Sequence, residues 1–516
     1  MASALDALLT EAARLIATQR YADAVPIAQS AVNADPNCSE AHMKLGIALS
    51  LSAQAPLAIE SFQRAIALQP DFAACYHELG YSYTAVARLP EAIAAYRRAF
   101  ELKPRLPNIG SNVLMNLNYI DDIEPQDVFR EHLRVAQSYP SPNPPPRRDA
   151  ANRRIRIGYY SPDFCAHPLY LFTSPLLQLA DRNRFELFCY SDVVRPDAIT
   201  QILQRTGHAW RDVARANDSQ LDAAIRQDQL DILVDLAGHT ARNRIAVIAS
   251  KPAPILINYL GYLNTTGLPS VDYRLTDHHA DPSPLRDSLH SERLVRLPES
   301  FVTYVVPRGL PEPSPPPCLS RGYVTFGSFN NLLKISPTIA SAWAKVLDAV
   351  PNSRLRLSSS FFPDPAARDV LFARLSAAGI DVARVTFLPP QDGLLNHLLR
   401  YFDFDIALDT FPYQGGTTTC EAMQMGVPVV ALSAPSHVSR IGVSLLINSG
   451  QSHMLASNVP EFVRIAADLA TDPVRLSHLR RTLRGQMTAS RLCDQRGFVR
   501  NVEAAYQSMI LTPPSA

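Results

Sequence analysis

Small and apolar positions in the first 105 residues recur with a spacing of 34. Residues 4–37, 38–71 and 72–105 superimpose, and proline, alanine and glycine positions coincide. These positions are Pro36, Pro70 and Pro104; Ala24, Ala58 and Ala92; Ala31, Ala65 and Ala99; and Gly46 and Gly80. Small residues let two helices approach, and a proline ends a helix. The pattern therefore predicts three helix pairs.

Such a 34-residue helix pair resembles the tetratricopeptide repeat. Solenoids of this kind present a concave face to peptides, so binding a protein is the expected role of residues 1 to about 105. Three repeats can also serve as a structural cap. An unrelated helical bundle is the alternative, which the coincident glycine, alanine and proline positions disfavour.

Further along the chain, short strand-like runs alternate with helical patterns. The runs are RRIRIGYYSPDF, FELFCYSDV, LDILVDLAG and PILINYLGY, followed by YVTFGSFN, RLRLSS, RVTFLP, FDIALDT and VPVVALS. Alternation of this sort predicts parallel α/β architecture. The expected fold class is therefore α plus α/β, with a repeat solenoid followed by two Rossmann-like lobes.

Two proline-rich stretches, YPSPNPPPRR and PRGLPEPSPPPCLSRG, divide the chain. The expected units are repeats and transitional helices at 1–138, a linker at 139–152, an N-terminal lobe at 153–306, a second linker at 307–320 and a C-terminal lobe at 321–516. Open α/β sheets bind ligands at the carboxyl ends of their strands. The chemistry is therefore expected between the two lobes.

Composition narrows the function classes. Apolar residues make up 47% and charged residues 19%, and 49 basic against 48 acidic groups leave a net charge of +1, which favours neither nucleic acid nor an anionic membrane. The seven cysteines are scattered without a C-x-x-C pair or zinc spacing, as in a reducing compartment. No signal peptide or run of roughly 20 apolar residues stands out. We therefore expect a soluble, cytoplasmic protein.

The segment FDIALDTFPYQGGTTTCEAMQMG predicts a buried strand ending near Asp409, a loop, and a helix that begins at Thr417 or Thr418. Gly415 and Gly416 let the backbone approach a ligand closely. The first N–H groups of the helix lack intrahelical partners, so they can donate to phosphate oxygens. An ordinary connection with threonine as N-cap is the alternative.

Further residues supply groups for the same ligand. Lys334, after FGSFNN, offers a compact charge for a leaving pyrophosphate. Glu421, one turn into the helix that begins at Thr417 or Thr418, could accept from a ribose diol. His397 and Arg400, in HLLR, are expected on one helical face lining the phosphate site. The alternatives are a solvated lysine and an exposed helix face.

The N-terminal lobe offers candidates for acid–base chemistry. Asp163 and His167 lie in the loop after its first strand, where the imidazole could act as a general base. His239 follows another strand end, and capping or packing is the alternative for either histidine. The Asp-Phe-Asp at 403–405 imitates a metal-binding D-x-D. We discount it because its second aspartate leads into a buried run, and we predict no metal site.

Six segments in this order resemble the O-GlcNAc transferase and SPINDLY family of protein O-glycosyltransferases (glycosyltransferase family 41). They are GYYSPDFCAHP, DILVDLAGHTARNR, KPAPILINYLGYLNTTGLPSVDYRLTD, TFGSFNNLLKISP, HLLRYFDFDIALDTFPY and GGTTTCEAMQMGVPVVAL. Members of this family join tetratricopeptide repeats to a two-lobed GT-B catalytic region. The resemblance covers essentially the whole chain, with a short repeat array.

The resemblance implies roles for particular residues. Lys334 is expected to assist the leaving diphosphate, Thr417 and Thr418 to donate to it, and His397 and Arg400 to line the nucleotide site. These residues correspond to the family positions in TFGSFNNLLKISP, GGTTTCEAMQ and HLLR. The same set therefore emerges from the family pattern and from the chemistry of the side chains.

Other positions indicate which branch of the family the chain resembles more. Glu421 stands where O-GlcNAc transferases carry an aspartate to the ribose, and His167 matches the family histidine proposed as a base. Gly416 replaces the histidine that O-GlcNAc transferases carry before the two threonines. GYLNTTGLPSVDYRLTD, FGSFNNLLKI and IGVSLL are closer to SPINDLY, whose plant members transfer fucose from GDP-fucose, whereas Arg440 resembles the O-GlcNAc branch. The donor stays open.

We therefore expect an inverting, metal-independent transfer of a sugar from a nucleotide sugar, UDP-GlcNAc or GDP-fucose, to serine or threonine of proteins that the repeats bind. The nucleotide sugar is a co-substrate, and no prosthetic group is expected. The expected catalytic residues are Asp163, His167, His239 and Lys334. Two alternatives are a non-catalytic repeat scaffold that senses a nucleotide sugar, and a two-lobed enzyme acting on a small sugar nucleotide.

Overall fold

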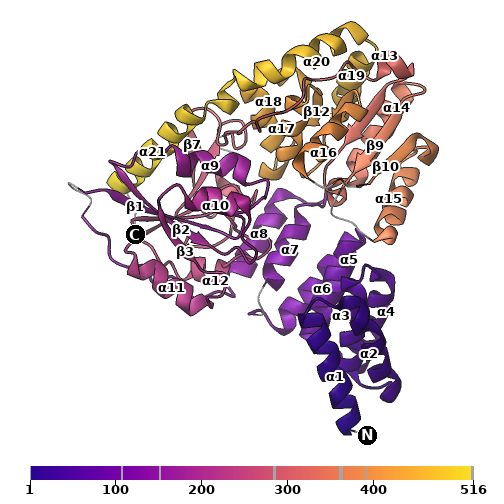
Figure 1. The fold of residues 1–516 in the computed structure, drawn as a ribbon, viewed down its shortest axis with the longest axis vertical. Helices are drawn as coiled ribbons and strands as arrows, with labels where there is room; N and C mark the ends of the chain where they lie inside the picture. The colour runs from indigo at the N-terminus through magenta and orange to yellow at the C-terminus, as the bar shows by residue number, and fades with distance from the viewer. Residues whose placement is uncertain are drawn as a thin grey trace.

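The N-terminal helices form three pairs in the computed structural model, which describes residues 2–105, 108–149, 153–282, 286–359, 364–389, 391 and 393–512. The pairs are α1 (Ala2–Ala17) with α2 (Tyr21–Ala34), α3 (Ser39–Leu51) with α4 (Ala55–Leu68), and α5 (Ala73–Ala85) with α6 (Leu89–Leu102) (Figure 1). The pairs follow the 34-residue period, with α1 beginning two residues before the first unit, so the predicted repeats are confirmed.

Close helix packing explains the glycines of the repeats. A Cβ atom on Gly46 would lie 2.6 Å from the ring of Phe62, and one on Gly80 would lie 2.8 Å from the ring of Tyr96. The backbone repeats as well, because the turn inside each pair contains a residue with φ near +60°. These residues, 34 apart, are Gln19, Ala53 and Ala87.

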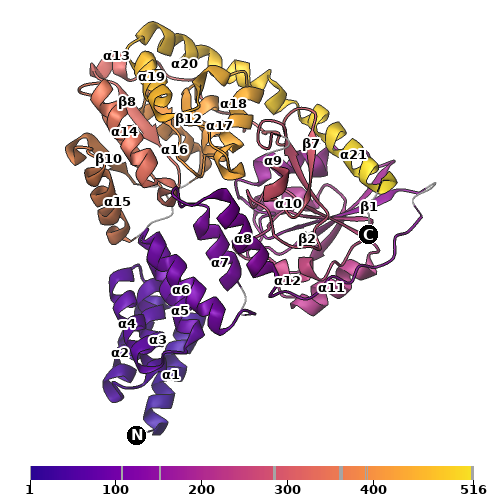
Figure 2. The same ribbon diagram turned by 180° about the vertical axis from the view of Figure 1, so that it is seen from behind.

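Two further helices, α7 (Ile109–Leu117) and α8 (Pro125–Ala136), continue from the repeats. In both views they lie between the repeats and the rest of the molecule (Figures 1 and 2). The proline-rich segments at 141–149 and 310–316 contain neither helix nor strand. Among the helices that the structure describes, none combines the length and apolar character that crossing a bilayer requires.

The N-terminal lobe is a parallel seven-stranded sheet with the order β3-β2-β1-β4-β5-β6-β7. Its strands are β1 (Ile155–Ser161), β2 (Phe185–Ser191), β3 (Ala209–Asp212), β4 (Ile232–Asp235), β5 (Ile255–Asn258), β6 (Tyr273–Asp277) and β7 (Arg293–Leu297). Its helices are α9 (Tyr170–Gln178), α10 (Ala198–Gln204), α11 (Asp218–Gln227), α12 (Ile245–Ala249) and the 3₁₀ turn η1 (Asp287–Leu289).

The C-terminal lobe is a parallel six-stranded sheet with the order β10-β9-β8-β11-β12-β13. Its strands are β8 (Thr325–Ser328), β9 (Arg354–Ser358), β10 (Val385–Leu388), β11 (Ile406–Leu408), β12 (Val429–Leu432) and β13 (Leu455–Ala456). Its α-helices are α13 (Cys318–Arg321), α14 (Pro337–Ala349), α15 (Pro365–Ala377), α16 (Leu394–Leu399), α17 (Thr417–Gln424), α18 (Ile441–Asn448), α19 (Val459–Ala470) and α20 (Pro473–Thr488). Its 3₁₀ turns are η2 (Leu332–Lys334), η3 (Val382–Arg384), η4 (Arg400–Asp403), η5 (His437–Ser439), η6 (Ser452–Met454) and η7 (Arg491–Cys493).

The nine predicted strands are all present, but β3, β6, β7 and β13 were not predicted. Three of these four lie at sheet edges. Central parallel strands are covered on both faces and read as continuous apolar runs, whereas edge strands are short and partly polar. The sequence Ala-Trp-Arg-Asp of β3, which is exposed or half-buried throughout, has no such run.

The last helix, α21 (Gln495–Leu511), leaves the C-terminal lobe and packs on α9 and β7 of the N-terminal lobe (Figure 1). The Tyr506 and Tyr159 hydroxyls lie 3.2 Å apart, and Glu503 Oε1 accepts from the Asp181 N–H at 2.8 Å. The expected lobe at 321–516 therefore extends over its neighbour. An amphipathic helix does not reveal from its own pattern which surface it covers.

Candidate active site

Lys334 lies on the short turn that follows β8. The side chain of Asn331 caps this turn by accepting from the Leu333 N–H at 3.0 Å. Lys334 Nζ donates to the carbonyl of Gln414 at 3.0 Å and lies 4.2 Å from the centroid of the Tyr413 ring. The lysine therefore reaches the loop that precedes α17, as the leaving-group role requires.

The buried carboxylate of Asp409 stabilises this loop by accepting hydrogen bonds from it. Asp409 Oδ1 accepts from the backbone N–H of Thr410 and of Gly415, both at 2.8 Å, and from the Asn330 amide at 3.3 Å. Asn330 Oδ1 in turn accepts from the Thr418 hydroxyl at 2.9 Å. The ends of β8 and β11 and the start of α17 thus form one network, which brings Lys334 and the Gly-Thr turn together.

Helix α17 begins at Thr417, as predicted from the sequence. Its N-cap is Gly416, which has no side chain to occupy the first N–H groups. Thr417 and Thr418 are partly exposed, whereas Gly415 is buried. Unpaired N–H groups and the helix dipole favour an anion at this end of the helix. The geometry suits the oxygens of a diphosphate.

The surroundings of Lys334 and Asp409 shift the pKa values of both groups toward neutrality. Burial lowers the pKa of Lys334 to about 8, although the charge of Asp409 opposes the shift. Burial raises the pKa of Asp409 to about 6, against the N–H donors of Gly415 and Thr410 and the charge of Lys334. Near pH 7 both are charged, which places an ammonium group beside the start of α17.

The predicted nucleotide-site residues His397 and Glu421 contact each other. Glu421 Oε2 accepts from His397 Nε2 at 3.0 Å and from the Tyr401 hydroxyl at 2.9 Å. Burial lowers the pKa of His397, but the hydrogen bond and charge of Glu421 outweigh it, so that the pKa lies above its ordinary value. The Glu421 carboxylate is therefore held by two donors, and its contact with a ribose stays a proposal.

Arg400 does not share the surroundings of His397. Helix α16 ends at Leu399, and the chain tightens into a 3₁₀ turn that begins at Arg400. Arg400 Nη1 lies 3.5 Å from Asp403 Oδ2, and its backbone keeps the αR conformation, so that its shared helical face with His397 stays a prediction. Placement of Arg400 in the phosphate site gains no support from these contacts.

The Asp-Phe-Asp sequence serves internal contacts. Asp403 also pairs with Arg356 at 3.1 Å. Asp405 accepts from the Cys318 and Thr325 N–H groups at 2.9 and 2.8 Å. In the described ranges, no three His, Cys, Asp or Glu side chains are arranged to hold a metal ion.

Asp163 and His167 lie together in the loop after β1. His167 Nδ1 is 3.8 Å from Asp163 Oδ2 and accepts from the Leu169 N–H at 3.3 Å. The imidazole is 46% exposed, and burial raises the pKa of Asp163. Since Nδ1 is an acceptor, a neutral ring carries its proton on Nε2. In that tautomer Nε2 can donate a hydrogen bond, and the Asp163 carboxylate can accept a proton; which of the two groups acts as the base stays a proposal.

His239 is part of the packing between the helical unit, which comprises α1 to α8, and the N-terminal lobe. Its Nε2 donates to the carbonyl of Thr266 at 2.9 Å, and its Nδ1 accepts from the Ser111 hydroxyl at 2.9 Å. The ring is 2% exposed, and burial lowers its pKa to about 4. Because both nitrogens are engaged, we correct the expected catalytic role to the packing role that the sequence left open.

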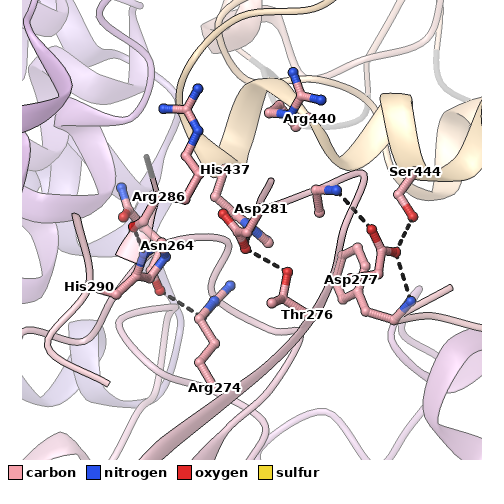
Figure 3. A network of polar contacts seen from close by, with 12 residues as sticks. Asn264, Arg274, Thr276, Asp277, Asp281, Arg286, His290, His437, Arg440 and Ser444 are labelled. Atoms are coloured by element: carbon pink, nitrogen blue, oxygen red, sulfur yellow. Dashed lines mark hydrogen bonds and ion pairs between the residues drawn. The ribbon is translucent and has the colours of Figure 1, made fainter. Parts of the chain in front are cut away.

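The lobes are joined by buried polar pairs that sequence reasoning missed (Figure 3). Asp281 Oδ2 accepts from His437 Nδ1 at 2.6 Å, and Asp277 Oδ2 accepts from the Ser444 hydroxyl at 2.5 Å. Burial raises the pKa of Asp281, but the charge and hydrogen bond of His437 outweigh it and hold the pKa well below its ordinary range. Asp277 is the last residue of β6 and Asp281 follows it, and their partners lie on η5 and α18.

A repeat solenoid joined to two Rossmann-like lobes, with an ammonium group beside the start of a helix, is the architecture of the GT-B fold class. The chain belongs to glycosyltransferase family 41. The model of this family matches residues 133–305 and 318–502.

Known proteins of the family resemble the chain at the level of both sequence and structure. A probable UDP-N-acetylglucosamine–peptide N-acetylglucosaminyltransferase SPINDLY of Oryza sativa subsp. japonica is 41% identical over 78% of this chain and 44% of its own length. The SEC protein of Arabidopsis thaliana, with the same printed activity, is 30% identical over 71% of this chain and 38% of its own. The chain thus spans less than half the length of these plant relatives.

A solved structure agrees with the fold. A mutant of the Thermobaculum terrenum O-GlcNAc transferase superimposes with a TM-score of 0.88 and 34% sequence identity, covering 99% of this chain and 98% of that one. The expected class of fold is confirmed. The higher identity to SPINDLY than to SEC supports the SPINDLY side of the family.

Proposed function

We propose that this protein transfers a sugar from a nucleoside diphosphate to serine or threonine hydroxyls of proteins, with inversion and without a metal. One observation carries the proposal: Lys334 and the start of α17 meet in a single network through Asp409 and Asn330. This network offers a charge and N–H donors where a diphosphate would leave.

The reaction would proceed by a single displacement. The acceptor hydroxyl attacks the anomeric carbon, the bond from that carbon to the diphosphate oxygen breaks, and the electron pair stays on the diphosphate. Lys334 and the N–H groups of Thr417 and Thr418 stabilise the charge that develops there. The hydroxyl proton passes to Asp163, while His167 Nε2 donates to an oxygen of the bound substrate.

The acceptor would come from the side of the helical unit. A recess of about 230 Å³ lies where all three units meet. Its lining includes Ile120 and Asp121 after α7, Asn264 of the N-terminal lobe, and Phe411 and Pro412 of the C-terminal lobe. A polypeptide held on the repeats could place a segment here, which would raise the effective concentration of its hydroxyl groups near Lys334.

Either of two donors fits this proposal. The printed names of the plant relatives specify UDP-N-acetylglucosamine, and the SPINDLY-like segments allow GDP-fucose. Discrimination between bases rests on hydrogen bonds in the pocket. The experiment is a thermal-shift titration with UDP and with GDP, because a ligand that binds only the native form raises the melting temperature. The preferred nucleotide should stabilise the protein more at equal concentration.

The corresponding nucleotide sugar is then incubated with the protein and a mixture of Ser/Thr-containing peptides, and the products are read by mass spectrometry. A mass increment of one sugar on a peptide supports the proposal. Stabilisation by a nucleotide without modification of any peptide or protein would instead favour the repeat scaffold that senses a nucleotide sugar. Conversion of the free nucleotide sugar alone would favour the small-molecule enzyme.

A further inference from the structure

We propose that the helical unit forms part of the donor site, and that Tyr119 positions Lys334 by packing against Tyr413. This inference rests on the proposed leaving-group role of Lys334. It adds a role for the segment after α7 that differs from the capture of a polypeptide. Tyr119 is a positioning residue, since it acts on Lys334 through another side chain.

The rings of Tyr119 and Tyr413 stack. Their centroids are 5.3 Å apart, the planes meet at 28°, and the side chains are 6% and 7% exposed. The Tyr413 ring also lies under Lys334 Nζ, which is 4.2 Å from its centroid. A continuous path of contacts therefore leads from the helical unit, through one aromatic ring, to the ammonium group.

Two further contacts hold the residues that directly follow Lys334. Asp121 Oδ2 accepts from the Thr338 N–H at 2.8 Å, at the start of α14. Arg374 donates from one nitrogen to the carbonyl of Ile335 at 2.6 Å and from another to the carbonyl of Ala87 at 3.1 Å. Ala87 is in the turn of the third repeat. The Lys334 segment is thus held from the repeats as well as from its own lobe.

The helical unit and both lobes share one apolar core. Ala87, Leu89 and Tyr119 of the helical unit belong to the apolar cluster that extends through both lobes. In both ribbon views, α7 and α8 lie against the lobes and not beside the repeats alone (Figures 1 and 2). The helical unit is therefore packed against the catalytic region, as a positioning role requires.

The Lys334 side chain needs packing contacts of this kind to stay in one position. Its flexible side chain has many rotamers, and fixing it costs entropy. A ring under the ammonium group favours one position through a cation–π contact, and a misplacement of about 1 Å is enough to cost a large factor in rate. Removal of Tyr119 would leave a cavity beside Tyr413, so that this ring could shift and release the lysine.

The test compares full-length Tyr119→Ala and Tyr119→Phe with Tyr81→Ala as a matched control. Tyr81 lies on α5, is 50% exposed and has no place in the proposed site. The readouts are the affinity for UDP or GDP, from thermal-shift titration, and kcat for a short peptide at saturating donor. Tyr119→Ala should weaken nucleotide affinity and lower kcat, each by about ten-fold or more, because the lysine would be misplaced. Tyr119→Phe keeps the stack and should retain both values.

The proposal is overturned if folded Tyr119→Ala keeps wild-type affinity and kcat, or if Tyr119→Phe loses as much as the alanine variant. A merely structural role would lower the melting temperature of Tyr119→Ala without changing kcat. Should the alanine variant not fold, Tyr119→Leu fills most of the space without an aromatic ring and must show the same two losses. If the wild-type protein transfers no sugar, the proposed function fails, and nucleotide affinity alone decides this inference.

Discussion

Lys334 keeps its charge in partly buried surroundings. The Gln414 carbonyl accepts from its ammonium group, the Tyr413 ring lies beneath it, and Asp409 supplies the opposing charge. The ammonium group donates to a neutral carbonyl, and Asp409 Oδ1 receives three N–H donors of its own, whereas Asp409 Oδ2 has no hydrogen-bond partner in the described ranges. We infer that the charge is held in place for a ligand.

Replacement of this lysine tests that inference directly. Lys334→Ala should lower kcat by about 100-fold to 1000-fold, because one preorganised donor to a developing oxyanion contributes that much. The fold should persist, since Asp409 keeps its three N–H donors and, with a pKa of about 6, can also be neutralised by protonation. Transfer to a peptide is measured beside circular dichroism. Near-normal turnover in the folded variant would contradict the leaving-group role.

The pH dependence of kcat/KM gives a second test at this residue. The folded-state pKa of Lys334 is lowered to about 8 by burial, with Asp409 opposing the shift. The ammonium form is therefore present below this value and lost as the pH rises through it. We expect kcat/KM to fall above about pH 8, because this quantity follows ionisations of the free enzyme.

Lys334→Arg provides the matched comparison. A guanidinium group stays protonated far above pH 8, so the alkaline decline should disappear even where the variant is slower. An unchanged decline in this variant would assign the ionisation to another group. The comparison therefore separates the lysine from its titrating neighbour Asp409.

At the level of single residues, the sequence identified the side chains expected to contact a ligand. It missed the residues that hold these side chains in position. Lys334, Thr417 and Glu421 stood out because their chemistry suits a nucleoside diphosphate and their segments follow strands. Asn330 and Tyr413 gave no such indication, because an amide and an aromatic ring have many ordinary uses. Only their contacts show that they position the lysine and the threonines.

Among the elements, the helix pairs are the ones most fully determined by sequence. Their 34-residue period appears again as three turns with the same backbone conformation. The glycines mark where one helix crosses the next. A Cβ atom on Gly80 would come within 2.8 Å of the Tyr96 ring, which is 2% exposed and has little space to move.

Gly80→Ala should therefore lower the free energy of unfolding by about 1–3 kcal/mol, the usual cost of overpacking. Gly485→Ala is the control, because Gly485 lies on α20 with no atom within 4 Å of its added Cβ. That substitution should stabilise by about 0.5–1 kcal/mol through helix propensity. Urea unfolding followed by circular dichroism measures both. Equal effects of the two substitutions would rule out the packing explanation.

For the molecule as a whole, the junction between the lobes depends on a few buried polar pairs. The side chains of His437 and Asp281 are 1% and 0% exposed. Replacing one residue of such a pair leaves the other buried without a compensating partner. Replacing a histidine at the surface leaves no buried group unpaired. The junction is therefore expected to be sensitive to single substitutions.

His437→Ala should lower the free energy of unfolding by about 3–5 kcal/mol, because it leaves the Asp281 carboxylate buried and unpaired. His453→Ala is the control, since His453 is exposed on η6 and a surface change should stay within about 0.5 kcal/mol. Urea titration gives both values. Equal stability of the two variants would show that the pair does not hold the lobes.

The sequence by itself determined the repeats, the nine strands with strong apolar runs, the start of α17 and the chemistry gathered around it. These features depend on local periodicity and on residue types at strand ends, which neighbouring residues specify. Tertiary structure alone decided that α21 covers the N-terminal lobe, that His239 is engaged in packing, and that Tyr119 and Tyr413 stack beneath Lys334. Contacts of this kind join residues far apart in the chain, and no local pattern specifies which two surfaces will meet.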